Sequence, residues 1–188
     1  MLFHDVCRTP VAAPLLPGRL RAEPFRLLRE LGLPAEDLLI AGSAPLYVRG
    51  LRDRIGDLDV VARGEALRRA LVLGRPEPAP FDGAVSIRLM GGRLEITDSW
   101  FVGMFGEVED LFDRAERIGG FRFLTVADTV VWKQRLDRPK DRLDLQRMAE
   151  PADRDRSTGC QGRAVCSVQP VVQRPGTPGT GRSWRGRD

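Results

Sequence analysis

The segment 38–61, LLIAGSAPLYVRGLRDRIGDLDVV, constrains the fold of this chain more than any other. A β-rich apolar run ends in Gly42 and Ser43, a spacer of thirteen residues follows, and a second β-rich run opens with Asp57 and Asp59. Short apolar runs bounded by turn residues are typical of buried strands. We therefore expect two strands with a short connection between them.

The two carboxylates are expected to share one small volume. Side chains at positions i and i+2 leave a strand on the same face, so Asp57 and Asp59 should point the same way. Two anions held this close repel unless a cation lies between them, and oxygen-only ligands suit Mg²⁺ or Mn²⁺. The spacing therefore predicts a metal site with Mg²⁺ or Mn²⁺ as cofactor.

The Gly42-Ser43 corner has the features of a phosphate site. Gly42 allows the backbone to turn tightly, and Ser43 is a good N-cap for a helix beginning at Ala44 or Pro45. The N–H groups at the tip of such a helix favour a phosphate group. We therefore expect a nucleotide site, with an NTP as the ligand.

The order of these residues resembles the signature of the DNA polymerase beta-like nucleotidyltransferase superfamily, a Gly-Ser pair followed by an Asp-x-Asp with hydrophobic neighbours. The resemblance implies that a third acidic residue on a neighbouring strand completes the metal cluster. Glu95, between Leu94 and Ile96, matches best by position, and Asp98 is the second choice. The alternative is that Glu95 is a solvated residue on the outer face of its strand.

A second cluster follows in the segment FRFLTVADTVVWKQRLDRPKDRLDLQRM, which begins at residue 121. The chain has twenty-eight arginines and only two lysines, Lys133 and Lys140, and both lie here. A compact ammonium suits a phosphate oxygen as a point charge, so both lysines are candidate nucleotide contacts. Two surface lysines present by chance are the alternative.

The second cluster also resembles bacterial members of the superfamily, including relatives of the abortive-infection nucleotidyltransferase toxins. In those proteins a lysine on a helix and a following Lys/Arg-Asp-x-x-Asp segment close over the nucleotide. The resemblance implies that Lys133 meets the triphosphate and that Asp141 and Asp144, at i and i+3 of a helix, orient it. The alternative is a solvated helix face with ordinary ion pairs.

The remaining pattern predicts a mixed α/β (α+β) fold, a mixed sheet flanked by helices, with further helices at its C-terminal end. We expect helices over 24–31, 65–73, 108–118, 125–136 and 140–148, and a hairpin of strands 84–90 and 93–97 joined by Gly91-Gly92. Pro-rich residues 75–80 are expected to form an extended linker, and Trp100, Phe101, Met104 and Phe105 to pack in the core.

Length and composition limit the organisation of the chain. The 188 residues suit one domain, 23–150, after an irregular segment 1–22 and before a low-complexity, disordered tail 151–188. The tail is also what a shifted reading frame through GC-rich sequence would yield. The longest uncharged run has eleven residues, so we expect no membrane partner and a cytoplasmic protein.

Charge and residue usage exclude several function classes. The tail holds seven Arg and three Asp, which leaves 23 basic and 23 acidic residues in 1–150 and argues against a dedicated nucleic-acid-binding module. One histidine, His4, and three scattered cysteines indicate neither a histidine-dependent triad nor a zinc site.

The expected function is Mg²⁺-dependent transfer of a nucleoside monophosphate from an NTP to a hydroxyl acceptor, which tRNA, a protein or a small molecule would supply. Asp57, Asp59 and Glu95 would hold the metal, Gly42 and Ser43 the phosphates, and Lys133 the charge of the leaving group. One alternative is a catalytically inactive domain of the same fold that binds a nucleotide or a partner. Another is a toxin component neutralised by an antitoxin partner.

Overall fold

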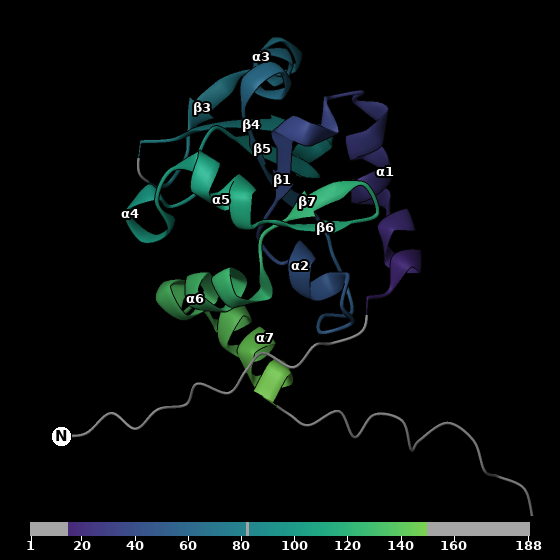
Figure 1. Cartoon of the computed structure of the whole chain (residues 1–188), viewed down its shortest axis with the longest axis vertical. Helices are drawn as coiled ribbons and strands as arrows, with labels where there is room; N and C mark the ends of the chain where they lie inside the picture. Colours follow the sequence, from purple (N-terminus) through teal and green to yellow (C-terminus); the bar gives the residue numbers. More distant parts are fainter. Residues whose placement is uncertain (1–14, 82, 150–188) are drawn as a thin grey trace, which may run out of the picture. The chain divides into compact units, whose positions relative to one another are not determined.

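A computed structural model describes residues 15–81 and 83–149 of the chain. Seven strands form one mixed sheet in the order β3-β4-β5-β2-β1-β7-β6 (Figure 1). The strands are β1 (Leu38–Ile40), β2 (Leu58–Ala62), β3 (Pro76–Pro78), β4 (Val85–Leu89), β5 (Leu94–Thr97), β6 (Glu116–Ile118) and β7 (Phe121–Phe123). Helices flank this sheet, which confirms the predicted mixed α/β class.

Seven α-helices and three 3-10 helices connect the strands within the described residues. The α-helices are α1 (Glu23–Glu30), α2 (Ala44–Tyr47), α3 (Gly64–Leu73), α4 (Val102–Phe105), α5 (Val108–Arg114), α6 (Val126–Leu136) and α7 (Pro139–Ala149). The 3-10 helices are η1 (Pro17–Arg21), η2 (Ala35–Asp37) and η3 (Met90–Gly92). None of the described helices has both the length and the apolar character needed to cross a bilayer.

The centre of the sheet is built from the segment that dominates the sequence. Strand β1 runs antiparallel to β2, and β2 runs parallel to β5, so that Asp59 of β2 lies in register with Glu95 of β5. The short helix α2 connects β1 to β2, as the Gly-Ser corner predicted. The two acidic positions are thus neighbours across two parallel strands.

Alternation along the strands divides the core between the two faces of the sheet. Leu58, Val60 and Ala62 pack in one cluster with residues of α1 and α3, while Val61 packs in the other with residues of α4, α5 and α6. Because side chains alternate along a strand, Asp59 lies on the same face as Val61. The second cluster contains Trp100 and Phe105, as the sequence predicted, and both side chains are buried.

Helices α6 and α7 lie next to each other at one end of the sheet, and α6 also contacts α2 (Figure 1). Helix α6 begins where Thr125 accepts a hydrogen bond from the backbone N–H of Asp128, which satisfies a donor that the helix start would leave without a partner. The second sequence cluster is thereby brought to the Gly42-Ser43 corner.

Three expectations for local structure need correction. The predicted helix 108–118 ends at Arg114, and residues 116–118 form β6, which pairs with β7 across a turn at Gly119 and Gly120. The two glycines, read as a helix end, have positive φ angles and suit a hairpin turn equally well.

The other two corrections concern proline-rich segments. Residues 76–78 of the expected linker form the edge strand β3, where a proline costs no ladder hydrogen bond if its nitrogen faces outward. In the expected irregular segment 1–22, residues 17–21 form η1 and Leu20 is buried. Residues 1–14, and the predicted tail 151–188, lie outside the described part of the chain.

Candidate functional site

The Gly42-Ser43 corner lies directly against the Asp59 carboxylate. The backbone N–H of Ala41 donates to the carbonyl oxygen of Asp59 at 2.8 Å, which extends the β1–β2 ladder by one residue. At Gly42 the chain turns with a φ of +60°, and a Cβ built there would overlap with Asp59 Oδ2. Only glycine fits this turn without displacing the carboxylate, so the corner and the acidic motif form one unit.

Three carboxylates lie on this part of the sheet. Asp57 immediately precedes β2 and is exposed, Asp59 is partly buried within it, and Glu95 occupies the position in register with Asp59. The pKa of Asp59 is raised from 3.8 to about 6, first by burial and then by the negative charges of Asp57 and Glu95. The charges of Asp57 and Glu95 therefore both act on Asp59.

The carboxylate of Glu95 nevertheless faces the other way along the sheet. Its Oε1 accepts a hydrogen bond of 2.7 Å from Ser86 Oγ, and its Oε2 lies 3.7 Å from Arg88 Nε, both on β4. Within residues 15–81 and 83–149, no group of three or more acidic, histidine or cysteine side chains converges closely enough to hold a metal ion. In this arrangement Glu95 is held by β4, whereas no hydrogen bond or ion pair to a described residue holds the carboxylates of Asp57 and Asp59.

The second choice for a third carboxylate, Asp98, has a structural contact of its own. It follows β5, and its Oδ1 accepts a hydrogen bond of 2.9 Å from the backbone N–H of Val85. This bond continues the pairing of β4 with β5 beyond the last residue of the strand. Register thus favours Glu95 over Asp98 as the acidic neighbour of Asp59.

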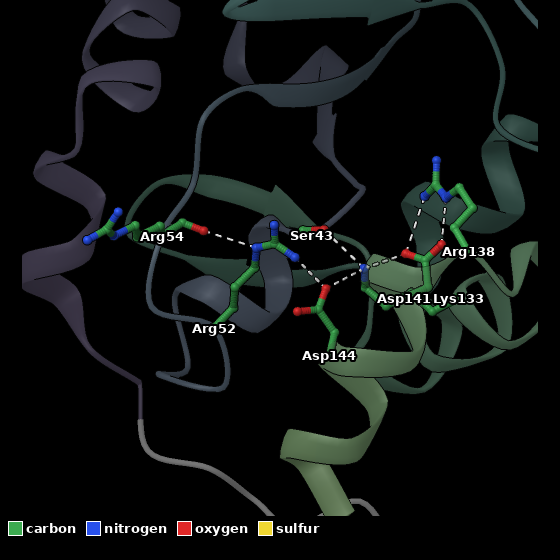
Figure 2. Close-up of polar contacts among 7 residues, drawn as sticks. All are labelled: Ser43, Arg52, Arg54, Lys133, Arg138, Asp141 and Asp144. Atoms are coloured by element: carbon green, nitrogen blue, oxygen red, sulfur yellow. Dashed lines mark hydrogen bonds and ion pairs between the residues drawn. The ribbon is translucent and has the colours of Figure 1, made fainter.

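Lys133 is fully buried at the junction of α6, α7 and the corner (Figure 2). Its Nζ donates to Ser43 Oγ at 3.0 Å, to Asp141 Oδ1 at 3.1 Å and to Asp144 Oδ2 at 2.9 Å. An ammonium has three protons, and all three have an oxygen acceptor here. A planar guanidinium could not serve three acceptors gathered around one point, which explains a lysine in a chain otherwise rich in arginine.

Two arginines complete the network around Lys133. Arg138 binds Asp141, with its Nε 2.6 Å from Oδ2, and Arg52 binds Asp144 from the loop before β2. Burial raises the pKa of Asp141, but hydrogen bonds from Arg138 and Lys133 outweigh it and hold that pKa below its usual value. Each buried carboxylate is thus paired with two cations, which offsets the cost of burying the charges.

The geometry separates the two lysines that the sequence grouped together. Lys133 exposes no surface, so it does not present its ammonium to a triphosphate in this arrangement; it ties Ser43 to α6 and α7 instead. Lys140 is exposed in the first turn of α7, and its charge, like that of Arg138, lowers the pKa of Asp59. Lys140 is therefore the lysine with an accessible charge near the acidic motif.

Sequence reasoning assigned no role to Arg52 or Ser86. Arg52 lies in the spacer between the corner and the acidic motif, where no periodicity indicates which side chains turn inward. Ser86 is a polar residue in a β-rich run, and only the strand register shows that it contacts Glu95.

Comparison with protein-family models, curated proteins and solved structures finds no match to this chain.

Proposed function

We propose that this protein is a metal-dependent nucleotidyltransferase, which moves a nucleoside monophosphate from an NTP to a hydroxyl-bearing acceptor with release of pyrophosphate. The observation that carries the proposal is the contact between the Gly42 turn and the Asp59 carboxylate. It joins the two halves of the motif that resembles the DNA polymerase beta-like superfamily, although thirteen residues separate them in sequence.

The carboxylates fit a hard divalent cation in part. No described residue donates a hydrogen bond to the carboxylate oxygens of Asp57 or Asp59, so these oxygens could bind a cation. A cation would also relieve the repulsion between the two carboxylates. Glu95 would join them only by leaving Ser86. Bound there, Mg²⁺ or Mn²⁺ would neutralise phosphate charge and acidify the acceptor hydroxyl.

The chain's own residues would position the nucleotide. The Gly42 turn brings the backbone close to the acidic motif, so a phosphate bound at the corner lies beside Asp59. Lys133 fixes the hydroxyl of Ser43, and Lys140 supplies an accessible positive charge near the same carboxylate. Transfer of this kind depends on positioning and charge more than on a protein nucleophile, which suits a site with no histidine among residues 15–81 and 83–149.

A second candidate function is nucleotide binding without turnover. The hydrogen bond from Ser86 to Glu95 favours it, because that bond keeps the third carboxylate away from the other two. A protein that binds Mg²⁺ and an NTP through Asp57 and Asp59 alone would hold the nucleotide but align it poorly for transfer.

The test is transfer of a labelled nucleotide. The full chain is incubated with labelled NTPs, Mg²⁺ and a bacterial cell extract, and label in macromolecules and small molecules is followed. We expect transfer by the wild type, none by Asp57→Asn/Asp59→Asn, and an unchanged rate with Asp113→Asn, an exposed carboxylate on α5. Mg²⁺-dependent NTP binding by calorimetry without any transfer would favour the second candidate instead.

A further inference from the structure

A pocket of about 250 Å³ opens between α7 and the loop that leads into β2. Four cationic side chains line it, together with two carboxylates, Asp53 and Asp144. The cations are Arg52, Arg54, Lys140 and Arg147. We refer to it as the basic pocket.

The positive charge of the basic pocket is available to a ligand. Asp144 is already bound by Lys133 and by Arg52, so its negative charge is compensated within this network (Figure 2). Arg54, Lys140 and Arg147 form no ion pair with a carboxylate of the described residues. Asp53 is the single remaining anion, so the basic pocket carries a net positive charge toward solvent.

The α7 residues of the basic pocket share one helix face. Lys140, Leu143, Asp144 and Arg147 are spaced i, i+3, i+4 and i+7, which places them in a row along the helix. Although residues 1–150 hold equal numbers of acidic and basic groups, the fold thus concentrates cations at one place. The overall composition of the chain does not reveal this local concentration of positive charge.

The basic pocket adjoins the acidic motif but is distinct from the corner. Asp144 lines it and is joined through Lys133 to Ser43, and the Gly42 turn beside Ser43 lies against Asp59, so the two regions are close. The Asp144 carboxylate lies between Arg52, on the side of the basic pocket, and Lys133, which contacts Ser43. A ligand in the basic pocket therefore approaches the acidic motif beside the corner and leaves the corner to the NTP.

We propose that the basic pocket binds a backbone phosphate of the acceptor, and that the acceptor is a nucleic acid. This inference rests on the proposed function and names its acceptor class. A polycation such as an aminoglycoside would be repelled by the basic pocket, and an unmodified protein side chain would gain nothing from it. A nucleic acid supplies phosphates close to its hydroxyl groups and is held by such contacts without regard to sequence.

The test measures binding without metal or NTP. A fluorescein-labelled oligoribonucleotide is titrated with the full chain, and anisotropy is recorded at several salt concentrations for the wild type and for Arg54→Glu/Arg147→Glu. The control is Arg21→Glu/Arg75→Glu, which makes the same charge change at two exposed arginines outside the basic pocket. Circular dichroism verifies that both variants are folded.

We expect the basic-pocket variant to bind at least about tenfold more weakly and to show a salt dependence reduced by about two phosphate contacts. The control should lose less than about twofold, and Mg²⁺-dependent NTP affinity should be unchanged in both. Equal losses in the two variants, an unaffected basic-pocket variant, or a selective loss of NTP affinity would each overturn the proposal.

The outcomes also separate this inference from the proposed function. RNA binding through the basic pocket without any nucleotide transfer would leave the phosphate-binding site standing but refute the enzyme, and with it the role of RNA as acceptor. Transfer to an uncharged or cationic acceptor at a rate unchanged by Arg54→Glu/Arg147→Glu would refute the inference and leave the enzyme standing.

Discussion

Replacement of Gly42 by alanine tests the contact between the corner and the acidic motif. The turn has a φ of +60°, and the new Cβ would overlap with Asp59 Oδ2, while lying 2.8 Å from Cγ and 3.1 Å from Cβ of the same residue. Because Cγ and Cβ are themselves too close, rotation of the carboxylate group alone cannot relieve the overlap. Either the side chain of Asp59 changes rotamer or the turn itself moves.

Gly32 is a matched control for the backbone effect. Its φ is +62° and a Cβ there would meet nothing within 4 Å, so Gly32→Ala measures the cost of the left-handed conformation alone. That cost is roughly 1–2 kcal/mol for a residue other than glycine. Overpacking adds typically about 1–3 kcal/mol, so Gly42→Ala should lower the free energy of unfolding by about 2–5 kcal/mol.

The assay is equilibrium urea unfolding of the full chain, followed by circular dichroism. In an Asp59→Ala background the overlapping Oδ2 and Cγ are gone and only the contact with Cβ at 3.1 Å remains, so Gly42→Ala should then cost little more than Gly32→Ala. The double-mutant cycle should therefore give a coupling energy of at least about 1 kcal/mol between positions 42 and 59. Equal costs at Gly42 and Gly32, or no coupling to Asp59, would refute the reasoning.

Three further predictions address the charges of the site. In urea unfolding, Lys133→Met should lower the free energy of unfolding by about 3–5 kcal/mol, because it removes a cation from two buried carboxylates. Lys140→Met, at an exposed position, should change it by less than about 0.5 kcal/mol. Because the pKa of Asp59 is raised, the folded metal-free protein keeps the Asp59 proton to higher pH than the unfolded chain does, so the free energy of unfolding should fall by up to about 3 kcal/mol as pH rises from about 4 to 6. Thermal melts across that range should show that Asp59→Asn abolishes this dependence. Glu95→Gln should weaken Mg²⁺-dependent NTP binding in calorimetry and Asp98→Asn should not, since only Glu95 is in register with the acidic motif; the reverse result would exchange their roles.

The parts of the fold that sequence predicted well depend on local patterns. The strands on either side of the corner, the hairpin of β4 and β5, and the helix that follows Thr125 all have boundary residues and periodicities typical of these elements. The expectation that Asp57 and Asp59 point the same way came from strand geometry, but β2 begins at Leu58, so that geometry applies to Asp59 alone. Such features need no knowledge of what lies across the sheet.

The parts that sequence missed depend on distant contacts. The residues before Gly119 and Gly120 have a helical pattern, yet pairing with β7 makes the last three of them a strand, since tertiary contacts override local preference. The burial of Lys133 likewise depends on Ser43, ninety residues earlier, and on two carboxylates of the next helix. No local pattern in α6 distinguishes a buried lysine from one that contacts a ligand.

The most direct test of the central claim is the position of a bound metal. Crystals grown with Mn²⁺ and a non-hydrolysable NTP would locate the metal by its anomalous scattering. We predict a peak between the carboxylates of Asp57 and Asp59, at roughly 2 Å from their oxygens, with the triphosphate at Gly42 and Ser43. A metal elsewhere, or a triphosphate held away from that corner, would contradict the account.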